Sequence, residues 1–232
     1  LEKCCPGLGC FDLGPPWATP LRIVPPPRCK EEAPVYFYLF TRANRMSKYS
    51  IQTWPKISLK GSNFDGLRNT VFYFHGWQSE PLTSRSTRSL DIKNAFLKLM
   101  DANVILVDYT SSSSSTYYPQ SVSDIRVVAA QVARLARYLI DTWGASASRM
   151  HMIGLSLGAQ AAAYSARGVS GVARLTGLDP AGPLFENQDK KVRINEGDAI
   201  LVEVLHTNGL ILGSLGMSRP AGKYIHVLLG RY

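Results

Sequence analysis

No apolar run in this sequence of 232 residues is long enough to span a bilayer, so we expect no transmembrane segment. Hydrophobic residues make up 45% and charged residues 19%, which is the composition of a globular protein. The length suits one large α/β domain with a fully buried sheet, and two ordinary domains would be cramped. We therefore expect a single soluble domain.

Cysteine is absent after residue 29. A cysteine cluster in a Pro- and Gly-rich terminal segment indicates disulfides that pin this segment to the body, here residues 1–30 packed on a domain of residues 31–232. A zinc site is the weaker alternative, because no histidine lies nearby and the spacing fits no usual finger. The chain opens without an apolar signal region, so we expect a mature, secreted form in an extracellular setting. The four cysteines are Cys4, Cys5, Cys10 and Cys29.

Acidic residues are scarce, since 17 Asp and Glu stand against 26 Lys and Arg, a formal net charge of +9. This charge attracts anionic surfaces, and a heparin-like polyanion stays open as a partner. The basic residues are scattered, and no recognition helix or aromatic-basic RNA motif accompanies them. We expect no nucleic-acid binding, and a solvated basic face is the ordinary explanation.

From residue 35 onward, β-rich runs alternate with helical ones, which predicts a mainly parallel sheet with flanking helices. The serine run 111–116 is low-complexity and predicts a flexible surface loop. Ligands of open α/β sheets bind beyond the carboxyl ends of the strands, so residues at strand ends are the first candidates for a site. The predicted strands cover 35–42, 70–77, 103–109, 149–156, 173–180 and 199–207, and the predicted helices cover 88–100, 121–143 and the stretch after residue 156.

The sequence Gly154-Leu155-Ser156-Leu157-Gly158 lies between a predicted strand and a predicted helix. A serine nucleophile needs such a tight turn to project its oxygen, and small flanking residues let strand and helix approach closely. The N–H of Leu157, at a helix start, can donate to a tetrahedral oxyanion. An ordinary strand-to-helix turn is the alternative. A second donor is expected after an earlier strand, where Gly76 permits unusual backbone geometry and Trp77 follows.

An acid is expected at the end of the next strand, and Asp179 stands there in "TGLDPAGP". Pro180 disfavours helical geometry at Asp179, which places the carboxylate on an extended strand end. An Asp-Pro turn is the common alternative. Chain order and spacing together favour a catalytic carboxylate.

These motifs, with "GLGCF", "NVILVDY", "IGLSLGAQ" and "VEVLHTNG", resemble the pancreatic (animal triacylglycerol) lipase family up to about residue 222. The resemblance implies an α/β-hydrolase fold that acts on lipid esters, triacylglycerol or phospholipid, at a lipid surface. It implies that Ser156 is the nucleophile, Asp179 the acid, and Trp77 with Leu157 the oxyanion hole. It also implies an N-terminal disulfide of Cys10 with Cys5 or Cys4, and Cys29 is a further candidate for a disulfide.

The family also binds a structural calcium ion after the acid strand, while the chemistry itself needs no cofactor. Here "KKVRINEGDA" falls at that place. The candidate ligands are the carbonyls of Lys190 and Arg193 and the side chains of Asn195 and Asp198, since oxygen ligands suit calcium. The family usually has Asp at the position of Asn195, so the expected site loses one negative charge. A plain acidic turn is the alternative.

The triad of this fold runs Ser, Asp, His in chain order. His75 and His151 precede the serine, His206 matches a family histidine that is not the base, and His226 comes too early. From the resemblance we therefore expect the triad histidine, the closing strands, the lid and the C-terminal β-sandwich of the family to be missing. A serine without a base is a weak nucleophile, so a catalytically inactive protein that binds lipid or a protein partner is the alternative function.

Overall fold

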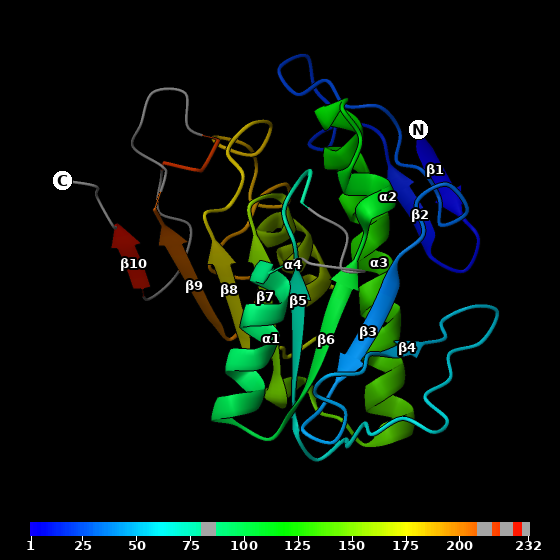
Figure 1. Ribbon diagram of the computed structural model, residues 1–232. Helices are drawn as coiled ribbons and strands as arrows, with labels where there is room; N and C mark the ends of the chain where they lie inside the picture. Colours follow the sequence, from blue (N-terminus) through cyan, green and yellow to red (C-terminus); the bar gives the residue numbers. More distant parts are fainter. Residues whose placement is uncertain (80–86, 208–214, 219–224, 229–232) are drawn as a thin grey trace.

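The computed structural model describes residues 1–79, 87–207, 215–218 and the backbone of 225–228. Its centre is an eight-stranded sheet in the order β10-β9-β8-β7-β5-β6-β3-β4 (Figure 1). Neighbouring strands from β10 to β6 are parallel, whereas β3 pairs antiparallel with both β6 and β4. The strands are β3 (Tyr36–Phe40), β4 (Tyr49–Ile51), β5 (Asn69–Phe74), β6 (Ala102–Asp108), β7 (Met150–Leu155), β8 (Arg174–Leu178), β9 (Leu201–His206) and β10 (Ile225–Leu228).

Helices cover both faces of this sheet, with α1 on one face and α3 and α4 together on the other (Figure 1). The predicted strands and helices are confirmed, apart from a few residues at their ends. The sequence patterns did not predict β1 (Glu2–Cys5), β2 (Gly9–Asp12), β4, β10 or two short helical turns. Within the described residues, no helix has both the length and the apolar character needed to cross a membrane. The helices are α1 (Thr87–Leu99), α2 (Thr110–Ser113), α3 (Tyr118–Trp143) and α4 (Leu157–Arg167), with a 3-10 turn η1 (Ala147–Arg149).

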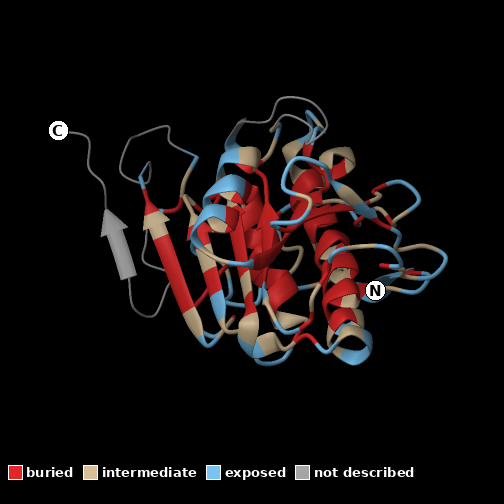
Figure 2. Ribbon diagram, turned by 60° about the horizontal axis from the view of Figure 1, so that its bottom comes forward, coloured by how far each residue is buried: buried red, intermediate tan, exposed pale blue. Residues whose placement is uncertain are grey.

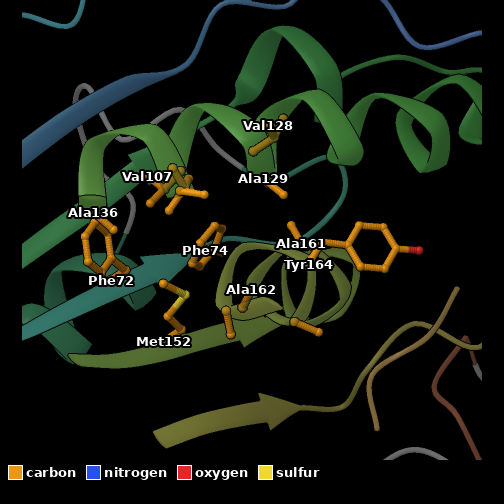
Figure 3. Packing of buried hydrophobic residues seen from close by; sticks show 14 of the residues in the cluster. Phe72, Phe74, Val107, Val128, Ala129, Ala136, Met152, Ala161, Ala162 and Tyr164 are labelled. Carbon is orange, nitrogen blue, oxygen red and sulfur yellow. The ribbon is translucent and has the colours of Figure 1, made fainter. Parts of the chain in front are cut away.

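The alternation of side chains along β5 divides the core into two layers. Phe72 and Phe74 pack with α3 and α4 (Figure 3), whereas Val71 and Tyr73 belong to the cluster beneath α1. All seven residues of β6 are buried, which places the centre of the sheet in the interior of the molecule (Figure 2). Burial on both faces explains why these strands read as near-continuous apolar runs.

The N-terminal cysteines form two disulfides on a small hairpin of β1 (Glu2–Cys5) and β2 (Gly9–Asp12). Of the two expected partners of Cys10, Cys5 is wrong and Cys4 is confirmed: Cys10 bonds to Cys4, and Cys5 bonds to Cys29. The hairpin register is the reason, because it sets Cys4 directly opposite Cys10. Alternation then turns Cys5 to the other face, where the Cys5–Cys29 disulfide is buried against Val127 of α3.

The first half of the serine run is not the flexible surface loop that its composition predicted, whereas Ser114 and Thr116 are exposed. Thr110–Ser113 forms the helical turn α2, and the side chains of Ser112 and Ser113 are fully buried. The Ser112 carbonyl accepts a hydrogen bond from the Ser121 hydroxyl at 2.6 Å, and the Ser113 carbonyl accepts one from the Gln78 backbone N–H at 2.9 Å. The small serine side chains allow this close packing, which joins α3 to the loop after β5.

An ion pair between Arg28 and Asp124 also joins the N-terminal segment to α3. The Asp124 side chain is fully buried and accepts hydrogen bonds from the Arg28 backbone N–H at 2.8 Å and from its Nη2 at 2.6 Å. The same guanidinium donates to the Ser111 carbonyl at 3.1 Å, beside the serine turn. Removal of one partner from a buried pair leaves a charge without compensation, which is the costly case.

We predict that Arg28→Met lowers the free energy of unfolding by about 3 kcal/mol, because it strands the Asp124 carboxylate in the interior. Arg68→Met is the matched control, since the side chains of the Arg68–Asp101 pair are 35% and 43% exposed and such a pair contributes at most about 1 kcal/mol. Denaturant unfolding measures both values. Equal losses in the two variants would contradict a stabilising role for the buried pair.

Candidate active site

Ser156 occupies a strained turn between β7 and α4. Its φ is 55° and its ψ is −120°, values that a residue with a side chain seldom adopts. The turn is forced by close packing, because a Cβ at Gly154 would lie 2.1 Å from the Gly158 carbonyl oxygen, and one at Gly158 would lie 2.3 Å from that of His75. The Ser156 N–H donates to Leu178 at 2.9 Å, which fixes the turn from β8. The sequence motif thus corresponds to a sharp strand-to-helix turn.

The loop after β5 lies directly against this serine. A Cβ at Gly76 would be 3.5 Å from the Cβ of Ser156. The Gln78 N–H is used by the Ser113 carbonyl, and the Trp77 indole donates to Ser115 at 2.9 Å. Among the described residues, the backbone N–H groups of Trp77 and Leu157 donate to no acceptor. Two unused donors therefore belong to the residues that flank Ser156 in space and in sequence.

Asp179 follows β8 and faces the end of β9. Its backbone N–H donates to the Leu205 carbonyl at 2.7 Å, and this bond holds it at the sheet edge. The φ of Asp179 is 44°, so the extended geometry predicted from Pro180 is wrong. One carboxylate oxygen accepts the Thr207 backbone N–H at 2.5 Å, and the other accepts the Thr207 hydroxyl. Sequence reasoning missed Thr207. The sequence could have pointed to it, because Thr207 follows the strand next to the one that Asp179 follows, and the ends of adjacent parallel strands meet at one edge of a sheet.

His75 is a structural residue beneath the loop of Trp77. Its buried ring stacks on the Tyr109 ring, with the ring centroids 4.3 Å apart. Nδ1–H of His75 donates a hydrogen bond to the Gly76 carbonyl oxygen at 3.0 Å. Nε2 accepts the Tyr109 N–H at 3.4 Å. Burial lowers the pKa of His75 and outweighs the hydrogen bond to Gly76 and the charge of Asp108, so the ring is neutral near pH 7. Both ring nitrogens hold the loop in place, as expected for a packed histidine.

The other three histidines lie on three different strands: His151 on β7, His206 on β9 and His226 on β10. His151 Nε2 is 2.8 Å from the Thr176 hydroxyl, and five residues along β7 place it about 16 Å from Ser156. His206 Nδ1 lies 2.8 Å from the Met217 carbonyl oxygen. His226 pairs with Val204 in the parallel β10–β9 register, and its side chain falls outside the described atoms. His75 and His151 are therefore unsuited as a base for Ser156.

The four calcium candidates lie together between β8 and β9, but their oxygens face hydrogen-bond donors. The Asn195 amide nitrogen donates to the Lys190 carbonyl at 3.0 Å, the Arg193 carbonyl at 3.3 Å and the Asp198 carboxylate at 2.8 Å. The Arg167 guanidinium pairs with the same carboxylate at 2.5 Å and donates to the Arg193 carbonyl. Calcium needs oxygens free of such donors. The residues as they stand do not fit the ion.

The sequence that forms this site matches known proteins. A family model described as "Lipase" matches residues 2–226. This chain belongs to the lipase family. It is 36% identical to human pancreatic triacylglycerol lipase over 229 residues, which cover 95% of this chain and 48% of that protein. It is 34% identical to the inactive pancreatic lipase-related protein 1 of Mus musculus over 211 residues, 89% of this chain and 43% of that one.

This lipase chain therefore spans about half the length of the curated relatives it matches. Among solved structures, it is similar to an α/β-hydrolase enzyme from a Medee basin deep-sea metagenome library, at 15% identity and a TM-score of 0.42 over 78% of this chain and 72% of that one. The family match and the strand order establish the α/β-hydrolase fold, with Ser156 in the turn that follows the fourth strand from the β10 edge.

We predict that the melting temperature of this lipase chain is the same in calcium chloride and in EGTA. Asn195→Asp replaces the inward amide by a carboxylate, and we expect this variant to melt at a higher temperature with calcium than without it. Asn187→Asp, which adds the same charge at an exposed residue of the same segment, is the control. A calcium-dependent melting temperature in the wild type would show that the site binds calcium, as the resemblance implied, and would contradict this prediction.

The pH dependence of stability should report on His151. Burial, and then Arg174, lowers the pKa of His151 from 6.5 to about 4. The folded state thus binds fewer protons than the unfolded state between these values. The stabilisation is complete above pH 6.5 and is lost as the pH falls toward 4, by about 3 kcal/mol at most. Unfolding of His151→Gln at each pH should show a shallower decline, and an unchanged slope would contradict the assignment.

Proposed function

We propose that this chain carries the nucleophile and the oxyanion hole of a secreted lipase that hydrolyses carboxylic esters of lipids, triacylglycerol or phospholipid. The observation that carries the proposal is Ser156 at φ 55°, beside two backbone N–H groups that find no acceptor among the described residues. Such a backbone conformation costs of order 1–3 kcal/mol and is retained where a site requires it. The two disulfides support an extracellular setting.

In this proposal the Ser156 hydroxyl oxygen attacks the ester carbonyl carbon. The N–H groups of Trp77 and Leu157 donate to the oxygen as it becomes negative, and the positive end of the α4 dipole favours the same charge. The alcohol departs with a proton, and water then releases the fatty acid from the acyl-serine. Asp179, already oriented by Thr207, is the carboxylate that orients an imidazole.

The proton of Ser156 needs an acceptor, because a neutral hydroxyl is a weak nucleophile. His75 and His151 have other partners. The resemblance led us to expect that none of the four histidines stands at the family's triad position, and the proposal keeps that expectation. We propose that residues 1–232 by themselves react slowly, through oxyanion stabilisation and substrate binding. In a serine protease, those two effects alone leave about 10³–10⁴-fold catalysis over water.

A catalytically inactive lipase-like protein that binds lipid or a protein partner is the second candidate. It is favoured because the ring nitrogens of His75 and His151 are engaged by other partners and so do not serve Ser156 as a base. One relative carries the description "inactive" in its name. The two candidates differ in whether the Ser156 hydroxyl reacts at all.

The test is covalent labelling by a fluorophosphonate, together with hydrolysis of p-nitrophenyl butyrate. We expect slow labelling and slow turnover that are abolished by Ser156→Ala and unchanged by Ser170→Ala, a control at an exposed serine. A wild type as inert as Ser156→Ala would establish the inactive protein. Loss of both signals in His226→Ala, with its melting temperature unchanged, would instead identify His226 as the base.

A further inference from the structure

A second concave site lies at the far end of α4. It is a groove of about 620 Å³ between α3, the end of α4, the N-terminal segment and residues 190–198. Ser156 precedes the first residue of α4, whereas Tyr164 and Arg167, which line the groove, stand in its last turn. Eight to eleven residues of helix separate the two places by about 12–16 Å. The groove is therefore distinct from the ester site.

The lining of this groove is mainly apolar. Trp17 and Tyr164 meet edge to face with ring centroids 5.7 Å apart, and Phe11 lies beside them. The α3 wall presents alanines, including Ala130, whose short side chains leave the space open. A volume of this size is within the range that accommodates a small molecule. An aromatic and aliphatic surface of this kind suits a hydrocarbon chain.

Cations stand along the same groove, and several lack an acidic partner. The Arg126 guanidinium lies 4.1 Å from the centre of the Trp17 ring and donates to the Asp12 carbonyl at 2.7 Å. Arg137 donates to the Gly168 carbonyl at 2.5 Å. Within the part of the chain that the structure describes, Arg126, Arg137 and Lys191 form no ion pair, whereas Arg167 pairs with Asp198.

Arg126 is a partly buried cation of this groove. Desolvation lowers the pKa of Arg126 to about 10, and the side chain still carries its proton at pH 7. Asp12 opposes this lowering but forms no ion pair with Arg126. A cation that is partly removed from water without an ion-paired carboxylate gains more from an anion than an exposed cation does. The apolar wall and this cation therefore favour the same ligand class, an anion with a long hydrocarbon tail.

We propose that the groove binds one long-chain carboxylate, with its hydrocarbon chain along Trp17 and Tyr164 and its carboxylate at Arg126. Charge complementarity selects the head group, since five basic residues line the groove against one acidic residue, Asp198. Arg137 and Lys191 flank the head group. The site stands apart from the proposed chemistry of Ser156, so it is tested in a chain that lacks this nucleophile.

The test uses dibromostearate, whose bromine atoms quench tryptophan fluorescence on contact. In Ser156→Ala protein, which retains all four tryptophans, we expect saturable quenching. Trp17→Phe should remove most of this quenching, and Trp77→Phe, which changes the tryptophan beside Ser156, should leave it. The reverse pattern would place the lipid in the ester site and overturn the proposal.

The head group is tested separately. Arg126→Gln should weaken dibromostearate binding at least tenfold, because a charged hydrogen bond contributes about 1.5–3 kcal/mol. Arg45→Gln, at an exposed arginine outside the groove, should not change it. Ala130→Leu narrows the groove at its apolar wall without altering charge and should also weaken dibromostearate binding. It replaces Arg126→Gln as the test if Arg126→Gln lowers the melting temperature.

Two further outcomes would overturn the proposal. Equal affinity for the neutral dibromostearyl alcohol would show that apolar surface alone captures the chain and that Arg126 selects nothing. Displacement of dibromostearate by heparin, with Arg126→Gln weakening heparin binding equally, would assign the basic rim to a polyanion. A fatty-acid site requires preference for the carboxylate and quenching through Trp17.

Discussion

The close approach of α4 to strands β5 and β7 determines the geometry of the candidate active site. No Cβ fits at Gly154 or Gly158, because each would overlap backbone atoms of the facing segment. Ser156 is the single residue between the end of β7 and the start of α4, and it makes the turn with a positive φ. This turn places the start of α4 beside the loop after β5. Trp77 and Asp179 acquire their relation to Ser156 from this contact, since both follow strands that flank or adjoin β7.

The two ends of α4 carry different electrostatics. At its start, helix geometry leaves the Leu157 N–H without an intrahelical acceptor, and this partial positive charge faces Ser156. At its end, Arg167 supplies a full charge to Asp198 and to carbonyls of the following loop. Burial raises the pKa of Asp198, while hydrogen bonds from Arg167 and Asn195 oppose this change. The loop is thus held by donors of the chain itself, and the groove beside it keeps a surplus of positive charge.

Most of the sheet was predictable because burial on both faces leaves a strong signal. The runs that became β5, β6 and β7 are apolar and end at glycine, aspartate and serine, which mark the carboxyl edge of the sheet. The serine run was misread because composition does not report burial: Ser112 and Ser113 are small enough to pack beneath α3. The sequence could not choose between Cys4 and Cys5 as the partner of Cys10, because sequence proximity does not report which face of a hairpin a cysteine occupies.

The sequence by itself determined the family, the order of the central strands and main helices, and the identity of Ser156 and Asp179 as the candidate nucleophile and acid. Those properties are local, since they depend on residue types at fixed spacing. Only the tertiary structure decided that Thr207 orients Asp179 and that the Asn195 amide faces the oxygens that were expected to bind calcium. It also brought Trp17 and Arg126 together at the far end of α4. These contacts join distant segments, and their geometry follows from sheet register and helix packing.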